Sequence, residues 1–157
     1  MKGLIDNNDN AVSRDAVSSC RQLGECISAR ILATDKPMNP KIKVACFTTL
    51  LLIANVRPDL IANYIKKLHP YLNIKIRTAC DNMVVIKTEK ILERTIPLMQ
   101  HPPTEWLTLL EMDLMKLVMF APNDAVEGAI SCLGALGLGQ NVLDISVIVS
   151  DSEHKLI

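Results

Sequence analysis

The feature that most constrains this chain is a succession of apolar stripes at helical spacing, separated by corners that contain proline. The pattern is clearest between Asp81 and Leu117, where two stripes flank His101, Pro102 and Pro103. The first stripe comprises Val84, Val85, Ile91, Leu92, Ile96, Leu98 and Met99, and the second comprises Leu107, Leu110, Leu114, Leu117 and Val118. Apolar residues that recur every three or four positions predict amphipathic helices, and proline ends one helix and suits the first turn of the next. The stretch therefore predicts an αα-hairpin whose two apolar faces cover each other.

Two further helices are predicted before this hairpin. Asn39 and Pro40 form a start signal, a capping side chain followed by proline in the first turn. The helix that follows, Lys41 to Val56, is apolar nearly all round, so we expect it to be sandwiched between other elements. A second stripe predicts a helix from Asp59 to Leu68, which Pro70 ends.

The same pattern extends toward both ends of the chain. An amphipathic helix is predicted from about Ala11 to Leu32, and Pro97 should kink or shorten the helix that contains it. The corner at residues 121–124 should close one helix and cap another, which Gly137 or Gly139 ends. This last helix should turn Val126, Ala129, Ile130, Leu133 and Leu136 inward.

The first helices of successive hairpins begin near residues 40, 80 and 124. This period of about 40 to 44 residues lies in the range of HEAT and armadillo repeats. The sequence therefore predicts an all-α fold, a HEAT-type α-solenoid of antiparallel helical hairpins. We expect residues 1–10 to form a disordered N-terminal segment, residues 11–137 the HEAT-repeat segment, and residues 138–157 a divergent, poorly ordered tail with a β-prone run at residues 145–149.

Composition agrees with helix-on-helix packing, since 49% of the residues are hydrophobic and only 3% are aromatic. The five cysteines, Cys20, Cys26, Cys46, Cys80 and Cys132, form no CxxC pair, which favours buried thiols in a reducing compartment over a zinc site. The N-terminus is polar, without the apolar core of a secretory signal, and the longest apolar run, Val44 to Val56, is too short to cross a bilayer. We therefore expect a soluble, intracellular protein with no membrane segment.

Sequence signals of an enzyme are absent. No glycine-rich loop follows a strand, no serine elbow or HExxH motif occurs, and Cys132 has no histidine near it in the sequence. Glu105, Glu111 and Asp113 could hold a metal ion, but a solvated helix face explains them better. We predict no catalytic residue, no cofactor site, no metal site and no small-molecule substrate.

The charge is unevenly divided, although the formal net charge is zero. Residues 36–77 carry eight basic residues and one acidic residue, whereas residues 78–157 carry five basic and eleven acidic residues. Lys66, Lys67, Lys75 and Arg77 fall in a stretch without acids, and in a solenoid they could form a strip that contacts DNA phosphates. The competing interpretation is that they are solvated helix ends that complement helix dipoles.

Several motifs resemble one known family. VRPDLI, HPYL, the segment KTEKILERTIPLMQHPP, LLEMDLMKLV and AISCLGALG occur in the same order as in the HEAT-repeat region of Nipped-B-like proteins, the adherin family of cohesin loaders. The resemblance runs from about Val44 to Gly137, with weaker similarity back to about Cys20. At about Leu138 the sequence diverges where the family continues with further helices, which we interpret as a truncated or alternatively spliced product or an error in the gene model.

The resemblance implies a non-enzymatic scaffold in the nucleus that supports loading of cohesin onto chromatin and sister chromatid cohesion. It also implies contacts with DNA, the kleisin subunit and the ATPase heads of cohesin, and promotion of the cohesin ATPase. Such a protein acts by binding some conformational states of another enzyme more tightly than others. The alternative hypothesis is a generic HEAT-repeat adaptor that binds a peptide or protein partner in its groove.

Overall fold

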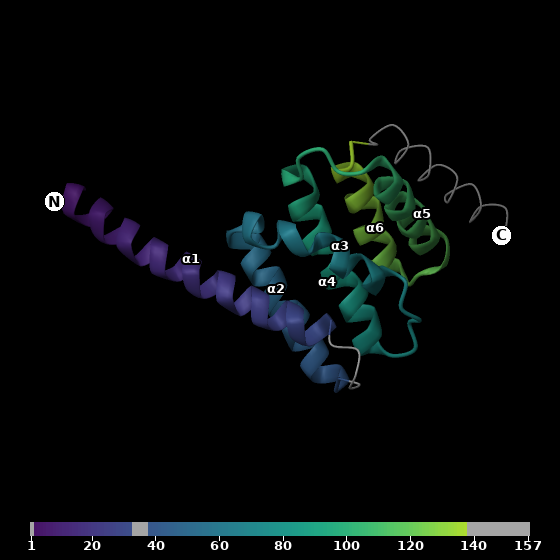
Figure 1. Ribbon diagram of the computed structural model, residues 1–157. Coiled ribbons are helices and arrows are strands. Elements are labelled where there is room, and N and C mark those ends of the chain that lie inside the picture. Colours follow the sequence, from purple (N-terminus) through teal and green to yellow (C-terminus); the bar gives the residue numbers. More distant parts are fainter. Residues whose placement is uncertain (1, 33–37, 138–157) are drawn as a thin grey trace.

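A computed structural model describes residues 2–32 and 38–137 of the chain, and all regular structure in these ranges is helical (Figure 1). The α-helices are α1 (Lys2–Leu32), α2 (Pro40–Val56), α3 (Ile65–Leu68), α4 (Ala79–Thr95), α5 (Thr104–Phe120) and α6 (Asn123–Ala135). Short 3₁₀-helices lie between them: η1 (Pro58–Leu60), η2 (Ala62–Tyr64), η3 (His69–Leu72) and η4 (Ile96–Leu98). The predicted all-α fold is thus confirmed.

The helices stack in two layers. In one layer α4 lies between α2 and α6, and in the other α5 packs on α6 and beside η3. The C-terminal part of α1 packs on α2 and η1, while its N-terminal part reaches away from the body (Figure 1). This stacking agrees with the predicted α-solenoid, and its assignment to the HEAT type stays a prediction.

The helix starts follow from local capping. Asn39 Oδ1 accepts a hydrogen bond from Lys41 N at 2.9 Å, and Pro40 is the first residue of α2, as predicted. The start of α4 is a capping box that the sequence analysis missed. There Thr78 Oγ1 accepts from Asp81 N, and Asp81 Oδ2 accepts from Thr78 N, both at 3.2 Å. Both arrangements satisfy backbone N–H groups that have no partner within the helix.

The helix ends also follow from the sequence. The α-helix α4 stops at Thr95 and continues as η4, so Pro97 shortens it as predicted. After α6, Gly137 adopts a positive φ of 79°, which glycine tolerates without strain and which ends the helix as predicted. At the intervening corner the N-cap of α6 is Pro122, and Asp124 Oδ1 accepts a hydrogen bond from Ala125 N at 3.0 Å.

Two elements differ from the prediction. The single helix expected from Asp59 to Leu68 is instead the series η1, η2, α3 and η3. So short a segment gains little from helical hydrogen bonds, and the burial of Leu60, Ile61, Ile65, Leu68 and Leu72 decides its path. The helix predicted from about Ala11 to Leu32 begins at Lys2 as α1, and the expected disorder of residues 1–10 stays a prediction. The predicted tail at residues 138–157 lies outside the described residues.

The core consists of two clusters that meet at α4. Val84 and Ile91 of α4 belong to a cluster with Phe47 of α2, whereas Val85 and Leu92 belong to a cluster with residues of α5 and α6. The prediction that the apolar faces of α4 and α5 cover each other is therefore wrong, although both helices contribute side chains to one of the two clusters. The closest neighbours of α4 are α2 and α6, and α5 rests mainly on α6.

Candidate interaction groove

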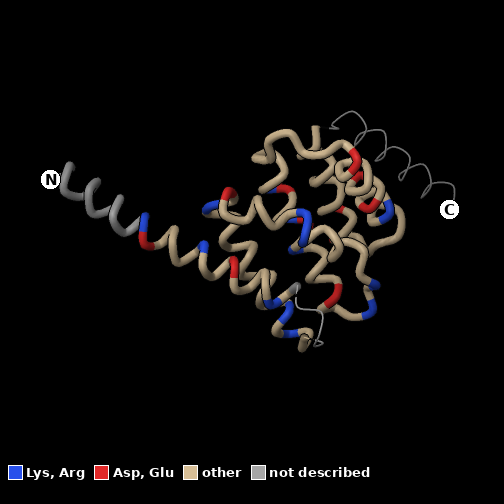
Figure 2. The backbone as a smooth tube through the Cα atoms, in the orientation of Figure 1, with Lys and Arg blue, Asp and Glu red and all other residues tan. Residues whose placement is uncertain are grey.

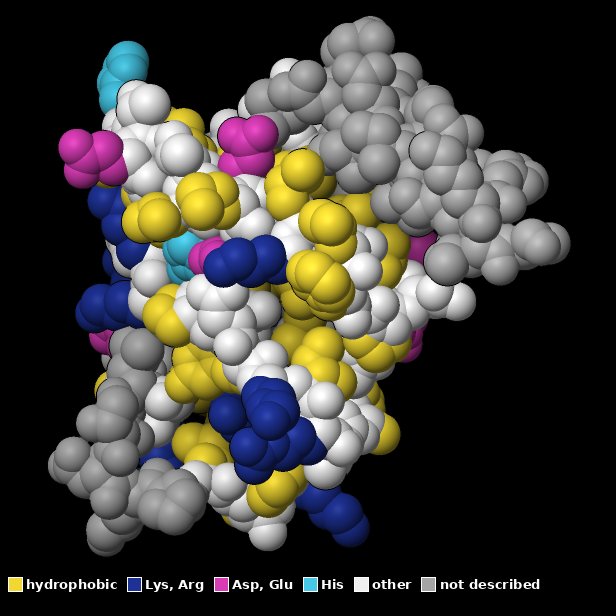
Figure 3. Space-filling view, turned by 90° about the vertical axis from the view of Figure 1, so that its right-hand side faces the viewer, with side chains coloured by type: hydrophobic (Ala, Val, Ile, Leu, Met, Phe, Trp, Pro, Cys, Tyr) yellow, Lys and Arg dark blue, Asp and Glu magenta, His cyan; other side chains and the backbone are white. Residues whose placement is uncertain are grey.

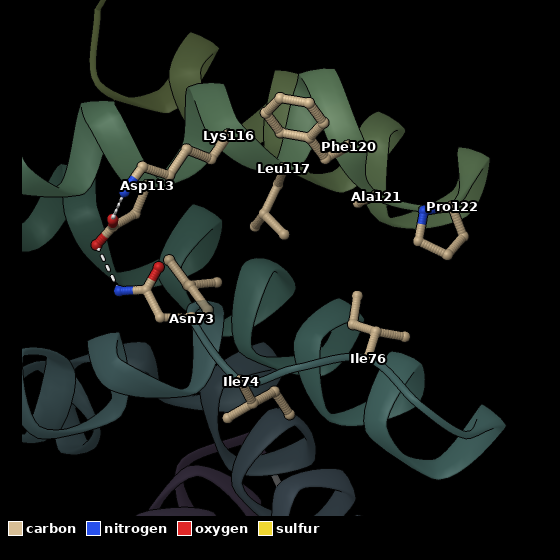
Figure 4. A pocket seen from close by; sticks show the side chains of 10 residues that line it. Asn73, Ile74, Ile76, Asp113, Lys116, Leu117, Phe120, Ala121 and Pro122 are labelled. Carbon is tan, nitrogen blue, oxygen red and sulfur yellow. Dashed lines mark hydrogen bonds and ion pairs between the residues drawn. The ribbon is translucent and has the colours of Figure 1, made fainter.

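The described surface carries an open groove of about 570 Å³. It lies between the connection that joins η3 to α4 and the C-terminal end of α5 (Figure 4). Both apolar and polar or charged residues line it, namely Leu72, Asn73, Ile74, Ile76, Asp113, Lys116, Leu117, Phe120, Ala121 and Pro122. The groove thus follows the two connections that link successive hairpins.

One wall is the irregular segment from Asn73 to Thr78. Ile74 and Ile76 are half-buried and line the groove, whereas Lys75 and Arg77 are exposed. Ile74 lies in a bend, and residues 75–77 have no regular secondary structure. The Arg77 N–H donates to Asp81 Oδ2 at 3.0 Å, so the capping box of α4 also fixes the end of this segment.

The opposite wall is held in place by Asp113 on α5. Its Oδ2 accepts hydrogen bonds from His69 Nε2 at 2.6 Å and from Asn73 Nδ2 at 2.9 Å, and its Oδ1 lies 4.0 Å from Lys116 Nζ. Since an ionised carboxylate only accepts hydrogen bonds, we place a proton on His69 Nε2. These bonds tie η3 to α5 and compensate the negative charge of Asp113 inside the groove. The ring of Trp106 packs edge-on against the ring of His69, with 5.9 Å between the ring centroids.

The acidic cluster considered as a metal site does not assemble. Asp113 bonds to His69 and Asn73, and in residues 2–32 and 38–137 no three His, Cys, Asp or Glu side chains come together as metal ligands. Similarly, none of the helices that the structure describes is long and apolar enough to span a membrane.

The four basic residues proposed for DNA contact fall into two pairs. Lys66 and Lys67 lie in the last turn of α3, and Lys75 and Arg77 lie in the connection beside the groove. All four side chains are exposed. Figure 2 shows the Lys and Arg positions spread over several elements rather than gathered on one. Their role in DNA contact stays a prediction.

Sequence reasoning missed two contributors to the groove, Lys116 and Phe120. The Lys116 side chain is 67% exposed and Phe120 is 80% exposed, near the C-terminal end of α5. Lys116 lies in the acidic half of the chain, so no local charge pattern marks it. Phe120 is one of two phenylalanines, and the other, Phe47, is fully buried.

Away from the groove, α4 buries a carboxyl group against α6. Glu89 is 0% exposed, and neither carboxyl oxygen has a hydrogen-bond partner among the described residues. Burial, with a smaller contribution from the charge of Asp124, raises the pKa of Glu89 to about 9. Gly128 provides the space, because a Cβ there would lie 2.5 Å from Glu89 Oε1. Glu89 is therefore protonated and uncharged at neutral pH.

Cys132 belongs to the same buried contact. Its thiol donates to the Glu89 carbonyl oxygen at 2.8 Å, and burial raises its pKa above the ordinary value. A buried thiol of raised pKa has little thiolate character at neutral pH.

Layered helices joined by short corners define the class of protein, an all-α fold of stacked helices. The comparisons then identify the family. The chain is 35% identical over 144 residues to the zebrafish Nipped-B-like protein B, covering 87% of this chain and 5% of that protein. It is 33% identical over 144 residues to the human Nipped-B-like protein, again covering 87% of this chain and 5% of that protein. It is 35% identical over 122 residues to the Drosophila Nipped-B protein, covering 78% of this chain and 6% of that protein.

These matches show that the chain belongs to the Nipped-B family, as its motifs predicted. The chain spans about 5% of the length of the vertebrate relatives it matches. No protein-family model matches the chain, and no solved structure gives a significant match.

Proposed function

We propose that the chain is a non-enzymatic scaffold segment of a cohesin loader, which supports loading of cohesin onto chromatin and sister chromatid cohesion in the nucleus. The observation that carries this proposal is the similarity to Nipped-B proteins over most of the chain. The stacked helices support it, because rigid paired helices present large surfaces without needing a reactive pocket.

The proposed partners are the kleisin subunit and the ATPase heads of cohesin, together with DNA. Such a scaffold would promote the ATPase by binding one arrangement of the heads more tightly than the other. Lys66, Lys67, Lys75 and Arg77 are proposed to contact DNA phosphates, and their exposure is compatible with this role.

Binding of the 157-residue chain to purified cohesin tests the protein contact. The immobilised chain is expected to retain cohesin and isolated subcomplexes that contain the kleisin or the heads. A Phe47→Ala variant, which removes a fully buried ring from the core, serves as the unfolded control. Retention of cohesin by the folded chain at the level of this control would refute the proposal.

Binding to a DNA duplex at several salt concentrations tests the phosphate contacts separately. Replacing Lys66 and Lys67, or Lys75 and Arg77, by Glu should weaken binding and reduce the slope of log affinity against log salt by about two units per pair. Lys90→Glu, an exposed basic residue on α4, is the matched control. If a pair of substitutions weakens DNA binding no more than Lys90→Glu does, its two residues do not belong to the proposed contact.

The groove favours a second candidate function, an adaptor that binds a peptide of a protein partner. This function predicts binding to a defined peptide whether or not cohesin is present. Competition between that peptide and cohesin for the immobilised chain would show that one surface serves both functions. Simultaneous binding would show that the two functions use separate surfaces.

A further inference from the structure

The outer face of α5 carries large apolar side chains that are mostly exposed. Among the described elements, α5 packs mainly on α6 and on η3. On its remaining face Leu109 is 56% exposed, Met112 52%, Met119 67% and Phe120 80%. Figure 1 places α5 on the right of the molecule, and on the face that Figure 3 turns to the viewer, hydrophobic side chains gather next to acidic and basic ones.

The exposed residues of this face follow the period of a coiled coil. They recur along α5 at steps of four, three, four and three: Glu105, Leu109, Met112, Lys116 and Met119. A mean step of about 3.5 residues keeps one line of side chains turned toward a second helix along the shared length. We call this line of five residues the α5 seam. Its apolar middle is flanked by a carboxylate near one end of the helix and an ammonium near the other.

The charges of the α5 seam are complementary to the same seam in the opposite direction. When two α5 helices run antiparallel with Glu105 of each copy facing Lys116 of the other, Leu109 of each copy faces Met112 of the other. A parallel pair would instead place Glu105 against Glu105 and Lys116 against Lys116. A single lysine among apolar seam positions sets the register of a coiled coil in this way.

Both charged groups are available for such a contact. Glu105 is exposed and forms no ion pair with the other described residues. Lys116 Nζ lies 4.0 Å from Asp113 Oδ1, and its side chain is 67% exposed. Since an ammonium has three N–H donors, Lys116 can reach a second carboxylate without leaving Asp113.

The apolar area suits a weak, reversible contact. With exposures of 52–80%, the four apolar side chains leave roughly 100 Å² each, or about 400 Å² per copy. Patches of this size on a soluble chain are often interaction sites. An antiparallel pair would cover about 800 Å² of apolar surface, below the area of most permanent interfaces, so we expect a dissociation constant in the micromolar range.

We propose that two copies of the chain associate through the α5 seam as a symmetric dimer with antiparallel α5 helices. Met119 and Phe120 of each copy then lie beside the corner at residues 101–103 of the other. A DNA duplex would leave the apolar side chains of the seam unused, whereas a second copy satisfies the apolar residues and both charges. The inference goes beyond the proposed loading function and does not depend on it.

The test is sedimentation velocity of the full 157-residue chain from about 1 µM to about 500 µM. The mass should rise from one chain to two as the concentration increases. Replacing both Leu109 and Met112 by Gln should raise the dissociation constant roughly ten-fold or more, because each substitution acts twice in a symmetric dimer. Glutamine is a good helix former, so the circular dichroism should not change.

Matched controls and charge reversals localise the contact. Leu52→Gln with Val56→Gln replaces residues of α2 that are 61% and 77% exposed, and should leave the dissociation constant unchanged. Glu105→Lys and Lys116→Glu should each raise it several-fold. Combining these two changes in one chain should restore the original value, because the charges that face each other are again opposite.

Four results would overturn the inference. The first is the mass of one chain at every concentration, and the second is an equal effect of the Gln substitutions in α5 and in α2. The third is a dissociation constant that Glu105→Lys leaves unchanged, which would exclude the antiparallel register. The fourth is loss of cohesin binding by the Leu109→Gln, Met112→Gln variant with an unchanged mass, which would assign the face to cohesin. A monomeric chain that retains cohesin leaves the proposed function intact.

Discussion

Glu89→Gln offers the sharpest test of the packing between α4 and α6. The Glu89 carboxyl is fully buried without a hydrogen-bond partner among the described residues, and Asp124 approaches from α6 with a like charge. Glutamine has nearly the same shape but cannot ionise. The substitution therefore removes the titration of this site and leaves its packing almost unchanged.

The magnitude follows from the pKa of Glu89, which rises from an ordinary 4.5 to about 9 in the folded protein. Because the pKa of Glu89 is higher in the folded than in the unfolded protein, the protonated carboxyl stabilises the fold. This stabilisation is complete at pH values below the unfolded-state pKa and is lost as the pH rises through the folded-state pKa. Between pH 4.5 and pH 7 the unfolded chain releases the proton and the folded chain keeps it, so the loss is about 1.4 kcal/mol per pH unit, or roughly 3 kcal/mol. Glu89→Gln avoids this loss.

The assay is urea unfolding of the chain and the variant, followed by circular dichroism at pH 4.5 and pH 7. The gain in unfolding free energy from Glu89→Gln should be about 3 kcal/mol larger at pH 7 than at pH 4.5. Glu127→Gln, an exposed site on α6, is the control and should change stability by less than about 0.5 kcal/mol at either pH. A pH-independent effect of Glu89→Gln would refute the reasoning and indicate that the carboxyl is ionised and paired.

Three further substitutions probe other contacts by the same unfolding assay. Gly128→Ala should lower the unfolding free energy by about 1–3 kcal/mol, because its Cβ would lie 2.5 Å from Glu89 Oε1. Gly134→Ala, with open space around the site, should be neutral or stabilise by up to about 1 kcal/mol. Equal effects of the two substitutions would contradict the close approach of Gly128 to Glu89. Asn39→Ala should cost about 1 kcal/mol by removing the cap of α2, and no loss would show that the cap is dispensable. Asp113→Ala should cost about 1–3 kcal/mol because it leaves the largely buried His69 ring and the Asn73 amide without their acceptor, and a neutral result would mean that other groups satisfy both.

Those parts of the fold that depend on local chemistry were predictable from the sequence. The Asn39–Pro40 start of α2, the shortening of α4 at Pro97 and the end of α6 at Gly137 each follow from one or two residues. Apolar periodicity also identified the buried positions of α5, Leu110, Leu114, Leu117 and Val118, with Leu107 half-buried.

Features decided by tertiary packing were not predictable in the same way. The path from Pro58 to Leu72 depends on what its side chains bury, not on helix propensity. The nearly uniform apolar character of α2 predicted a sandwiched helix, yet Leu52 is 61% exposed and Val56 is 77% exposed. Periodicity shows which residues can be buried, but the neighbours that bury them come from elsewhere in the chain.

The groove illustrates the same limit for the candidate site. Charge alone indicated Lys75 and Arg77, which border the groove in the structure. Lys116 and Phe120 come from about 40 residues further along the chain. The contact of Asp113 with His69 and Asn73, together with the packing of Leu72 and Leu117 in one cluster, brings the two walls together. No local pattern links a histidine in one hairpin to a carboxylate in the next.

The central claim is that these stacked helices form a binding segment of a cohesin loader. The most direct measurement is cohesin loading onto circular DNA by the zebrafish Nipped-B-like protein B in which the residues that align with positions 40–137 of this chain are replaced by those positions. The account predicts loading equal to that of the unaltered protein. Loss of loading by a replacement that remains folded and soluble would contradict it.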